Sequence, residues 1–149
     1  MATPPALRPS AAMLGAHLAL SAAIDRNAVD PLGHDKTQLD LLLRLSLEDD
    51  QQARASDLAS DMLLSPSHVS RRIDRAAEAG YICREPDPDD RRAHRVCLTS
   101  EGSAVVDEFR PRLEAVLEEV IFDTLTPNQI DTLVDLLGRV EAAARKAAE

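Results

Sequence analysis

The chain has 149 residues, of which 44% are hydrophobic and 29% are charged, and its formal net charge is −9 at pH 7. This length is enough for a domain that buries its own apolar core without crosslinks. Only 2% of the residues are aromatic, so the core must consist mainly of Leu, Val, Ile and Ala, as in packed helices. Such a negative total is unfavourable for unspecific nucleic-acid binding, so the distribution of charge matters more than its sum.

The sequence contains two cysteines, Cys83 and Cys97. Two cysteines exclude a disulfide framework, and a zinc site is expected to have more ligands at closer spacing. The alanine- and leucine-rich run 11–24 follows a single arginine, is interrupted by His17 and is too short to span a membrane. We therefore expect a cytoplasmic protein with no cofactor, no metal and no membrane partner.

The first 34 residues are expected to form an arm and one helix. Ser10 is predicted to cap a helix that runs to about Ala28 and stops before Asp30-Pro31. Its apolar side chains fall on two faces, one with Leu14 and Leu18 and the other with Leu20, Ile24 and Ala28. Two apolar faces on one helix predict burial between a dimer partner and the rest of the chain.

The next segments predict two further helices. Thr37 begins an imperfect capping box for a helix to about Leu47, with Leu39, Leu42 and Leu43 facing inward. The polar stretch 48–53 is expected to be a link, and 55–62 a helix that buries Leu58. The turn that follows carries Leu63 where glycine is common, so either the turn has ordinary dihedral angles or the helix ends differently.

A two-sided helix is predicted from Pro66 to Gly80. Ser65 is a good N-cap, and proline suits the first helical position because its missing N–H costs nothing there. One face of this helix is apolar, with Val69, Ile73, Ala76 and Ala77, and the other carries Ser67, His68, Arg71 and Arg75.

A charged β-hairpin should follow. Residues 81–85 and 95–98 alternate like strands, and 86–92 are rich in turn formers and charge. Pairing Ile82 with Leu98 places Cys83 opposite Cys97. These thiols are either a redox pair or two small side chains that fill a strand face in a reducing cell.

The remaining residues predict two long helices. Thr99 should cap the first, and Thr126-Pro127-Asn128-Gln129 is a capping signal for the second. The last helix carries an apolar stripe of Ile130, Leu133, Val134, Leu137 and Val140. This stripe is either a dimer interface or part of an intramolecular helical cap.

Positive charge is concentrated in residues 65–99, which carry seven arginines and six acidic residues, or +1, while the rest of the chain carries −10. A helix with a cationic face followed by a cationic hairpin suits a DNA duplex, with the helix in the major groove. We predict a mainly α fold with a small β-hairpin wing, a winged helix-turn-helix. The expected domains are 1–34 (arm and dimerisation helix), 35–100 (winged helix-turn-helix) and 101–149 (dimerisation helices).

Several short motifs resemble the MarR family of bacterial transcription regulators. They are Asp-Leu-Ala at 57–59, Leu-Ser-Pro-Ser at 64–67, Val-Ser-Arg at 69–71, Ala-Gly-Tyr-Ile at 79–82, Asp-Asp-Arg-Arg-Ala at 89–93 and Leu-Thr-Ser-Glu-Gly at 98–102. The resemblance implies a homodimeric repressor of a palindromic operator on double-stranded DNA, relieved by a small organic acid or phenol. The similarity to the family is close over about residues 37–102.

The expected DNA contacts come from two segments. His68, Arg71 and Arg75 are predicted to read bases, and Ser67 and Ser70 to bind phosphate. By resemblance to the family's Asp-x-Arg wing, Arg92 enters the minor groove while Asp90 holds its guanidinium. The complete predicted set is Ser67, His68, Ser70, Arg71, Arg72 and Arg75 in the helix, and Asp90, Arg91, Arg92 and Arg95 in the wing. Alternatively these charges form a solvated face with local ion pairs, such as Asp74 with Arg71.

The effector site is expected between the first, second and fifth helices, with candidate polar residues His17, Arg26, His34 and Asp35. This region shows no aromatic residue for stacking on a ring, and the two histidines alone make a poor metal site. No Gly-rich phosphate loop, Gly-x-Ser-x-Gly elbow or His-Glu-x-x-His pair is present, so we expect no enzyme. The alternatives are a winged-helix module that binds protein and a redox-responsive regulator that uses Cys83 and Cys97.

Overall fold

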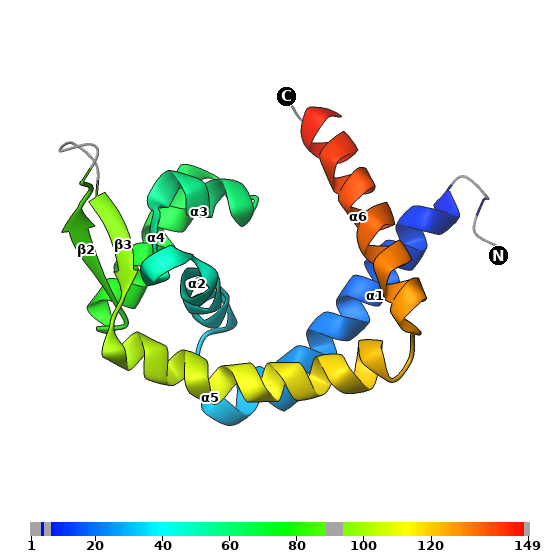
Figure 1. The fold of residues 1–149 in the computed structure, drawn as a ribbon, viewed down its shortest axis with the longest axis horizontal. Coiled ribbons are helices and arrows are strands. Elements are labelled where there is room, and N and C mark those ends of the chain that lie inside the picture. Colours follow the sequence, from blue (N-terminus) through cyan, green and yellow to red (C-terminus); the bar gives the residue numbers. More distant parts are fainter. Residues whose placement is uncertain (1–3, 5–6, 89–93, 148–149) are drawn as a thin grey trace. The chain divides into compact units, whose positions relative to one another are not determined.

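The computed structural model describes residues 4, 7–88 and 94–147. The fold is mainly helical with one small sheet, as predicted (Figure 1). Its helices are α1 (Arg8–Ile24), α2 (Lys36–Leu47), α3 (Ala55–Asp61), α4 (Pro66–Glu78), α5 (Ser100–Leu117) and α6 (Pro127–Ala147), and its strands are β1 (Gln52–Arg54), β2 (Ile82–Pro86) and β3 (His94–Leu98). The chain forms two compact units, residues 21–113 and residues 1–20 with 114–149.

Helix α1 begins before the predicted cap. Ser10 lies inside its first turn, where its hydroxyl donates to the Leu7 carbonyl at 3.0 Å. The expectation that Ser10 is the N-cap is therefore wrong, because the helix already includes Arg8 and Pro9. Past Ile24 the chain continues through a π-helical turn, Asp25–Val29, and then a 3₁₀ turn that ends at Gly33 with φ of +67°.

Helix α2 is capped by Asp35 rather than by Thr37. The Asp35 carboxylate accepts hydrogen bonds from the backbone N–H groups of Thr37 and Gln38, at 2.8 and 3.2 Å, and from the Thr37 hydroxyl. The predicted inward residues Leu39 and Leu42 are fully buried, and so are Leu41 and Leu45, which makes α2 the most deeply buried helix of its unit.

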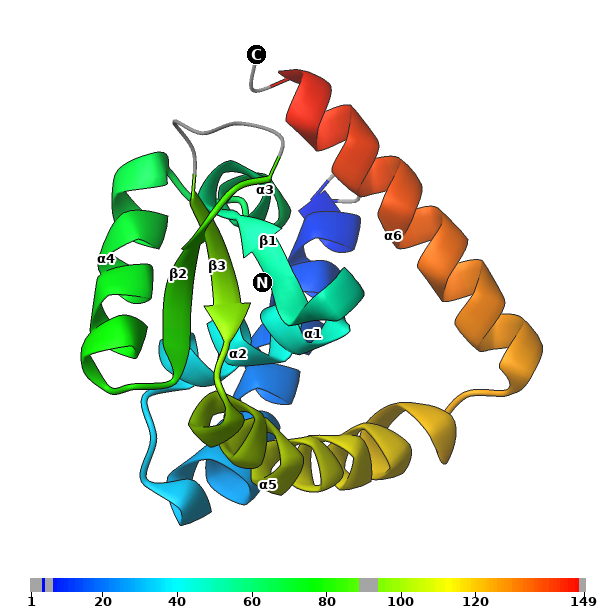
Figure 2. The same cartoon turned by 60° about the vertical axis from the view of Figure 1, so that its left-hand side comes forward.

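The sheet has one more strand than predicted. Part of the expected polar link forms β1, which pairs antiparallel with β3, so the order is β1-β3-β2 (Figure 2). The predicted hairpin register is confirmed, with Ile82 opposite Leu98 and Cys83 opposite Cys97. A three-residue strand gives almost no periodic signal, and only its pairing with a distant partner defines it.

Helices α3 and α4 both end in the same hydrogen-bonded turn. In α3 the Leu64 N–H reaches the Ala59 carbonyl and the Leu63 N–H reaches Ser60, and α4 repeats this pattern with Tyr81 and Gly80. Leu63 adopts φ of +52° and Gly80 φ of +79°. Leucine thus occupies the left-handed position, so both alternatives offered for this turn are wrong.

The core of unit 21–113 joins the helices to the sheet. Leu58 from α3, Val69 and Ile73 from α4, and Val96 from β3 are at most 2% exposed and belong to one cluster with the α2 leucines. This cluster fixes α4 against α2 and α3, so only one of its faces remains outside.

Thr99 caps α5 as predicted, since its hydroxyl accepts from the Gly102 N–H at 3.1 Å. A Cβ at Gly102 would lie 2.1 Å from the Tyr81 carbonyl, so only glycine allows this helix start to approach the hairpin. At the start of α6 the Gln129 carboxamide accepts from the Thr126 backbone N–H at 2.9 Å, which confirms that capping signal.

Candidate nucleic-acid interface

Helix α4 has one buried face and one exposed polar face. Ser65 caps it, with its hydroxyl accepting from the His68 N–H at 3.4 Å, and Pro66 occupies the first turn. Val69, Ile73 and Ala76 are buried as predicted. The exposed polar side chains are Ser67, His68, Ser70, Arg71, Asp74, Arg75 and Glu78.

Arg72 behaves differently from the other predicted contacts of α4. It is half-buried, and its guanidinium lies 3.6 Å from the Asp40 carboxylate of α2. The Arg72 side chain points toward α2, so it is not part of the exposed face that carries Arg71 and Arg75. Asp74 also differs from expectation, because it pairs with Arg84 of β2 rather than with Arg71.

Arg71 and Arg75 form no salt bridge with any residue in the described ranges. Both guanidinium groups are therefore available to an anionic partner. Arg75 also lies close enough to the start of α2 to contribute to lowering the pKa of Asp35, a shift caused first by the hydrogen bond from the Thr37 hydroxyl.

A buried carboxylate lies at the loop end of the hairpin, directly after β2. The Asp87 side chain is 0% exposed, and its Oδ2 accepts from Nε of Arg54 on β1 at 2.6 Å and from Nε of Arg95 on β3 at 3.3 Å. Arg95, a predicted phosphate contact, is thus held within the sheet. The predicted wing residues Asp90, Arg91 and Arg92 lie outside the described residues.

This winged-helix segment matches a known family. Residues 36–94, from the start of α2 into β3, match the model of the MarR family. Over this segment the chain is similar to the MarR family. The recognition made from the short motifs is therefore confirmed, and the family is one of transcriptional regulators.

Individual relatives agree with this assignment. The chain is 31% identical over 84 residues to the uncharacterized HTH-type transcriptional regulator YkoM of Bacillus subtilis, a match that covers 56% of this chain and 54% of YkoM. The chain thus spans about half the length of the curated relatives it matches.

Solved structures share the fold over nearly the whole chain. Sco3205 of Streptomyces coelicolor, a MarR family transcriptional regulator in complex with DNA, has a TM-score of 0.83 at 24% identity, covering 96% of this chain and 89% of Sco3205. BpsR of Bordetella bronchiseptica, whose DNA binding is regulated by 6-hydroxynicotinic acid, has a TM-score of 0.78 at 20% identity, covering 95% of this chain and 98% of BpsR.

A cavity of about 330 Å³ lies in unit 21–113. Phe109 of α5 is part of its wall, so the expectation that this region lacks an aromatic residue is wrong. Its charged side chains are paired, Arg72 with Asp40 and Lys36 with Asp25, the latter at 2.6 Å. The full lining is Ile24, Val29, Lys36, Thr37, Asp40, Leu43, Arg72, Phe109 and Leu113.

The four predicted effector residues are not brought together around this cavity. Asp35 is committed to capping α2, and the ring of half-buried His34 packs edge-on against Tyr81, with centroids 5.8 Å apart. Arg26 is exposed, and His17 is exposed on α1. Sequence reasoning chose polar side chains near the right helices, but it missed the apolar wall and the paired charges.

The two cysteines lie side by side on the hairpin and are both free thiols. The Cys83 thiol donates to the Cys97 carbonyl at 3.6 Å. Burial, and then the neighbouring Glu85 carboxylate, raise the pKa of Cys97 to about 11. The Cys97 thiol is therefore protonated at neutral pH in the free protein.

Across the described ranges, no helix combines the length and the hydropathy that a membrane span needs.

Proposed function

We propose that this chain is a sequence-specific DNA-binding transcription regulator that acts in the cytoplasm as a homodimer and not as an enzyme. The observation that carries the proposal is the exposed face of α4. Within the part of the chain that the structure describes, this helix presents Arg71 and Arg75 without salt bridges, and its other face is fixed in the core. A rigid helix with free cationic side chains suits the major groove, where arginine reads guanine.

The DNA complex of Sco3205 supports this use of the fold. His68, Arg71 and Arg75 would contact base edges, whereas Ser67 and Ser70 would bind phosphates. Arg92 would enter the minor groove from the wing, with Asp90 positioning it and Arg91 on a phosphate. Arg95 would act indirectly, by holding Asp87 and thereby the root of the wing.

Homodimer formation is supported by the exposed apolar side chains of unit 1–20 with 114–149. Val134 and Leu137 of α6 are 66% and 45% exposed in the single chain, and Leu14 and Leu18 of α1 are each 58% exposed. Exposed apolar side chains that repeat at helical spacing along α6 are typical of an interface with another protein. A two-fold symmetric dimer would read two half-sites one helical turn apart, hence a palindromic operator.

We assign the effector to the 330 Å³ cavity rather than to His17, Arg26, His34 and Asp35. A small organic acid or phenol could stack on Phe109 and bind Lys36 or Arg72 in competition with their acidic partners. Because Arg72 belongs to α4, an anion that draws it away from Asp40 would act directly on the DNA-reading helix. Relief of repression by such a ligand is supported by the regulation of BpsR by 6-hydroxynicotinic acid.

The test is fluorescence anisotropy with a labelled duplex from the region upstream of the protein's own gene, against a scrambled duplex, over a salt series. We expect nanomolar, saturable binding with clear preference for the upstream duplex, and an affinity that falls as salt rises. If both duplexes bind weakly, selection from a random-sequence pool follows. A pool from which no sequence is enriched would contradict the proposal and favour a protein-binding winged domain, which the net charge of −9 would suit.

A further inference from the structure

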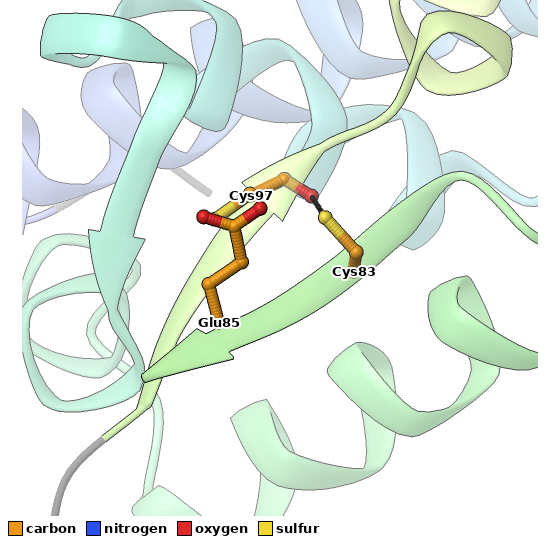
Figure 3. Close-up of side chains that lie close together, drawn as sticks. All are labelled: Cys83, Glu85 and Cys97. Atoms are coloured by element: carbon orange, nitrogen blue, oxygen red, sulfur yellow. Dashed lines mark hydrogen bonds between the residues drawn. The ribbon is translucent and has the colours of Figure 1, made fainter. Parts of the chain in front are cut away.

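Three metal-binding side chains converge on the outer face of the sheet. Strand alternation turns Ile82 and Val96 into the core, and it places Cys83 and Glu85 of β2 beside Cys97 of β3 on the other face. Figure 3 shows the three side chains close together, with the Cys83 thiol directed at the Cys97 carbonyl oxygen.

The distances are close to those of a coordination site. One ligand atom from each residue, Sγ of Cys83, Sγ of Cys97 and a carboxylate oxygen of Glu85, lies within 4.8 Å of the other two. Around a tetrahedral ion with Zn–S bonds of about 2.3 Å, two sulfur atoms are about 3.8 Å apart. Small changes in the side-chain rotamers of these residues would bring the ligand atoms from within 4.8 Å of one another to this spacing.

The donor set selects a class of ion. Two thiolates and one carboxylate suit a thiophilic divalent cation, whereas Mg²⁺ and Ca²⁺ prefer oxygen ligands alone. A fourth ligand is at hand, because the Gln52 side-chain oxygen of β1 lies 4.0 Å from the Cys97 sulfur, and a water molecule could take the same position.

Burial differs across the cluster in a way that suits an ion entering from solvent. Cys97 is buried, Cys83 is half-buried and Glu85 is exposed. Glu85 could therefore meet the ion first and the thiols could follow. In the free protein the Glu85 carboxylate disfavours a thiolate at Cys97, but a bound cation would compensate both negative groups.

We propose that Cys83, Glu85 and Cys97 form a binding site for one thiophilic divalent cation of the Zn²⁺ class at the root of the hairpin. Each thiol that binds the ion releases its proton to solvent. The proposal replaces our sequence-based expectation of no metal, which weighed the two cysteines without Glu85. It does not depend on DNA binding, and each can fail without the other.

The test uses the full chain, reduced with a phosphine and kept free of oxygen so that no disulfide forms. Titration with Cd²⁺ should give the ultraviolet band of cadmium–thiolate charge transfer, saturating at one ion per chain. Zn²⁺ should displace Cd²⁺ and should raise the thermal unfolding temperature, because an ion that binds only the folded state stabilises it.

Variants assign the ligands. Cys83→Ser and Cys97→Ser should lose the band and the thermal shift, and Glu85→Gln should weaken binding by at least about tenfold. Glu108→Gln, at an exposed position on α5, and His94→Ala, on the other face of the hairpin, should bind like the wild type.

Two results would overturn the assignment. A charge-transfer band that is absent, or that persists in either cysteine variant, would refute a two-thiolate site. Unchanged affinity in Glu85→Gln would refute the role of the carboxylate. Circular dichroism of each variant before titration separates loss of the site from loss of the fold.

Discussion

Leu63 occupies a backbone conformation that suits glycine. Its φ is +52°, and its side chain is 64% exposed, so little burial offsets the strain. The left-handed region costs a residue with a Cβ roughly 1–2 kcal/mol, and replacement by glycine removes this strain. Part of the gain is offset, because glycine also increases the conformational entropy of the unfolded chain. We expect Leu63→Gly to raise the free energy of unfolding by about 0.5–1 kcal/mol in urea denaturation.

Gly80 occupies the equivalent position after α4, so replacing it by alanine tests the same backbone strain in the opposite direction. Gly80 has φ of +79° and open space around it, so Gly80→Ala should destabilise the protein by about 1 kcal/mol through the backbone alone. A lower free energy of unfolding in Leu63→Gly would mean that the leucine side chain stabilises the folded state by more than its backbone strain costs.

Asp35 links stability to pH at the start of α2. Hydrogen bonds, first from the Thr37 hydroxyl, lower its pKa in the folded protein below the ordinary value of 3.8. Its contribution is therefore present above pH 3.8 and is lost as pH falls through the lower folded value. Asp35→Ala should cost about 1 kcal/mol at pH 7, and the cost should be smaller at pH 3, which lies below the ordinary value.

Chemical denaturation at both pH values would test this linkage. Asp107→Ala, at an exposed position within α5, should change stability by less than about 0.5 kcal/mol at either pH. A cost for Asp35→Ala that stayed constant from pH 7 to pH 3 would show that the carboxylate charge does not provide the cap.

At the scale of elements, the sheet depends on the buried carboxylate of Asp87. It joins Arg54 of β1 to Arg95 of β3, and both arginines keep contact with water, so they can hydrate if the carboxylate charge is removed. We expect Asp87→Asn to lower the free energy of unfolding by about 2 kcal/mol, less than for a fully buried ion pair. Asp74→Asn, which breaks the exposed pair with Arg84, should cost less than about 1 kcal/mol.

Equal losses in these two variants would contradict the role given to the Asp87 carboxylate. Amide hydrogen exchange supplies a second measurement, because the amides of β1 and β3 should lose protection in Asp87→Asn and keep it in Asp74→Asn.

Local signals predicted some elements and missed others. The cap, proline and apolar spacing of α4 are contained in a single stretch, and the hairpin register follows from alternation, so both were predictable. Strand β1 and the ion pair between Arg54 and Asp87 depend on residues 33 or more positions apart. For the same reason the cavity lining could not be read from the sequence. The closeness of Glu85 to the thiols does follow from the predicted register, because Cys83 and Glu85 lie on the same face of one strand.

At the scale of the whole molecule, the exposed stripe of α6 predicts a dimer. The solution mass from light scattering should be about twice the chain mass of 16.2 kDa. Val134→Lys, at a site 66% exposed in the single chain, should give a folded monomer, because a charge at the centre of an apolar interface is costly. Thr132→Lys, on the opposite side of the helix, should remain dimeric. A wild-type monomer would contradict the dimer proposal.

The most direct test of the DNA-reading role of α4 is the affinity of Arg71→Ala for the preferred duplex. We expect a folded variant whose binding is weaker by about 1–3 kcal/mol and whose preference over the scrambled duplex is reduced. Arg139→Ala, which removes an arginine that is 73% exposed on α6, should bind like the wild type. Unchanged affinity and preference in a folded Arg71→Ala would contradict the claim that this face of α4 reads DNA.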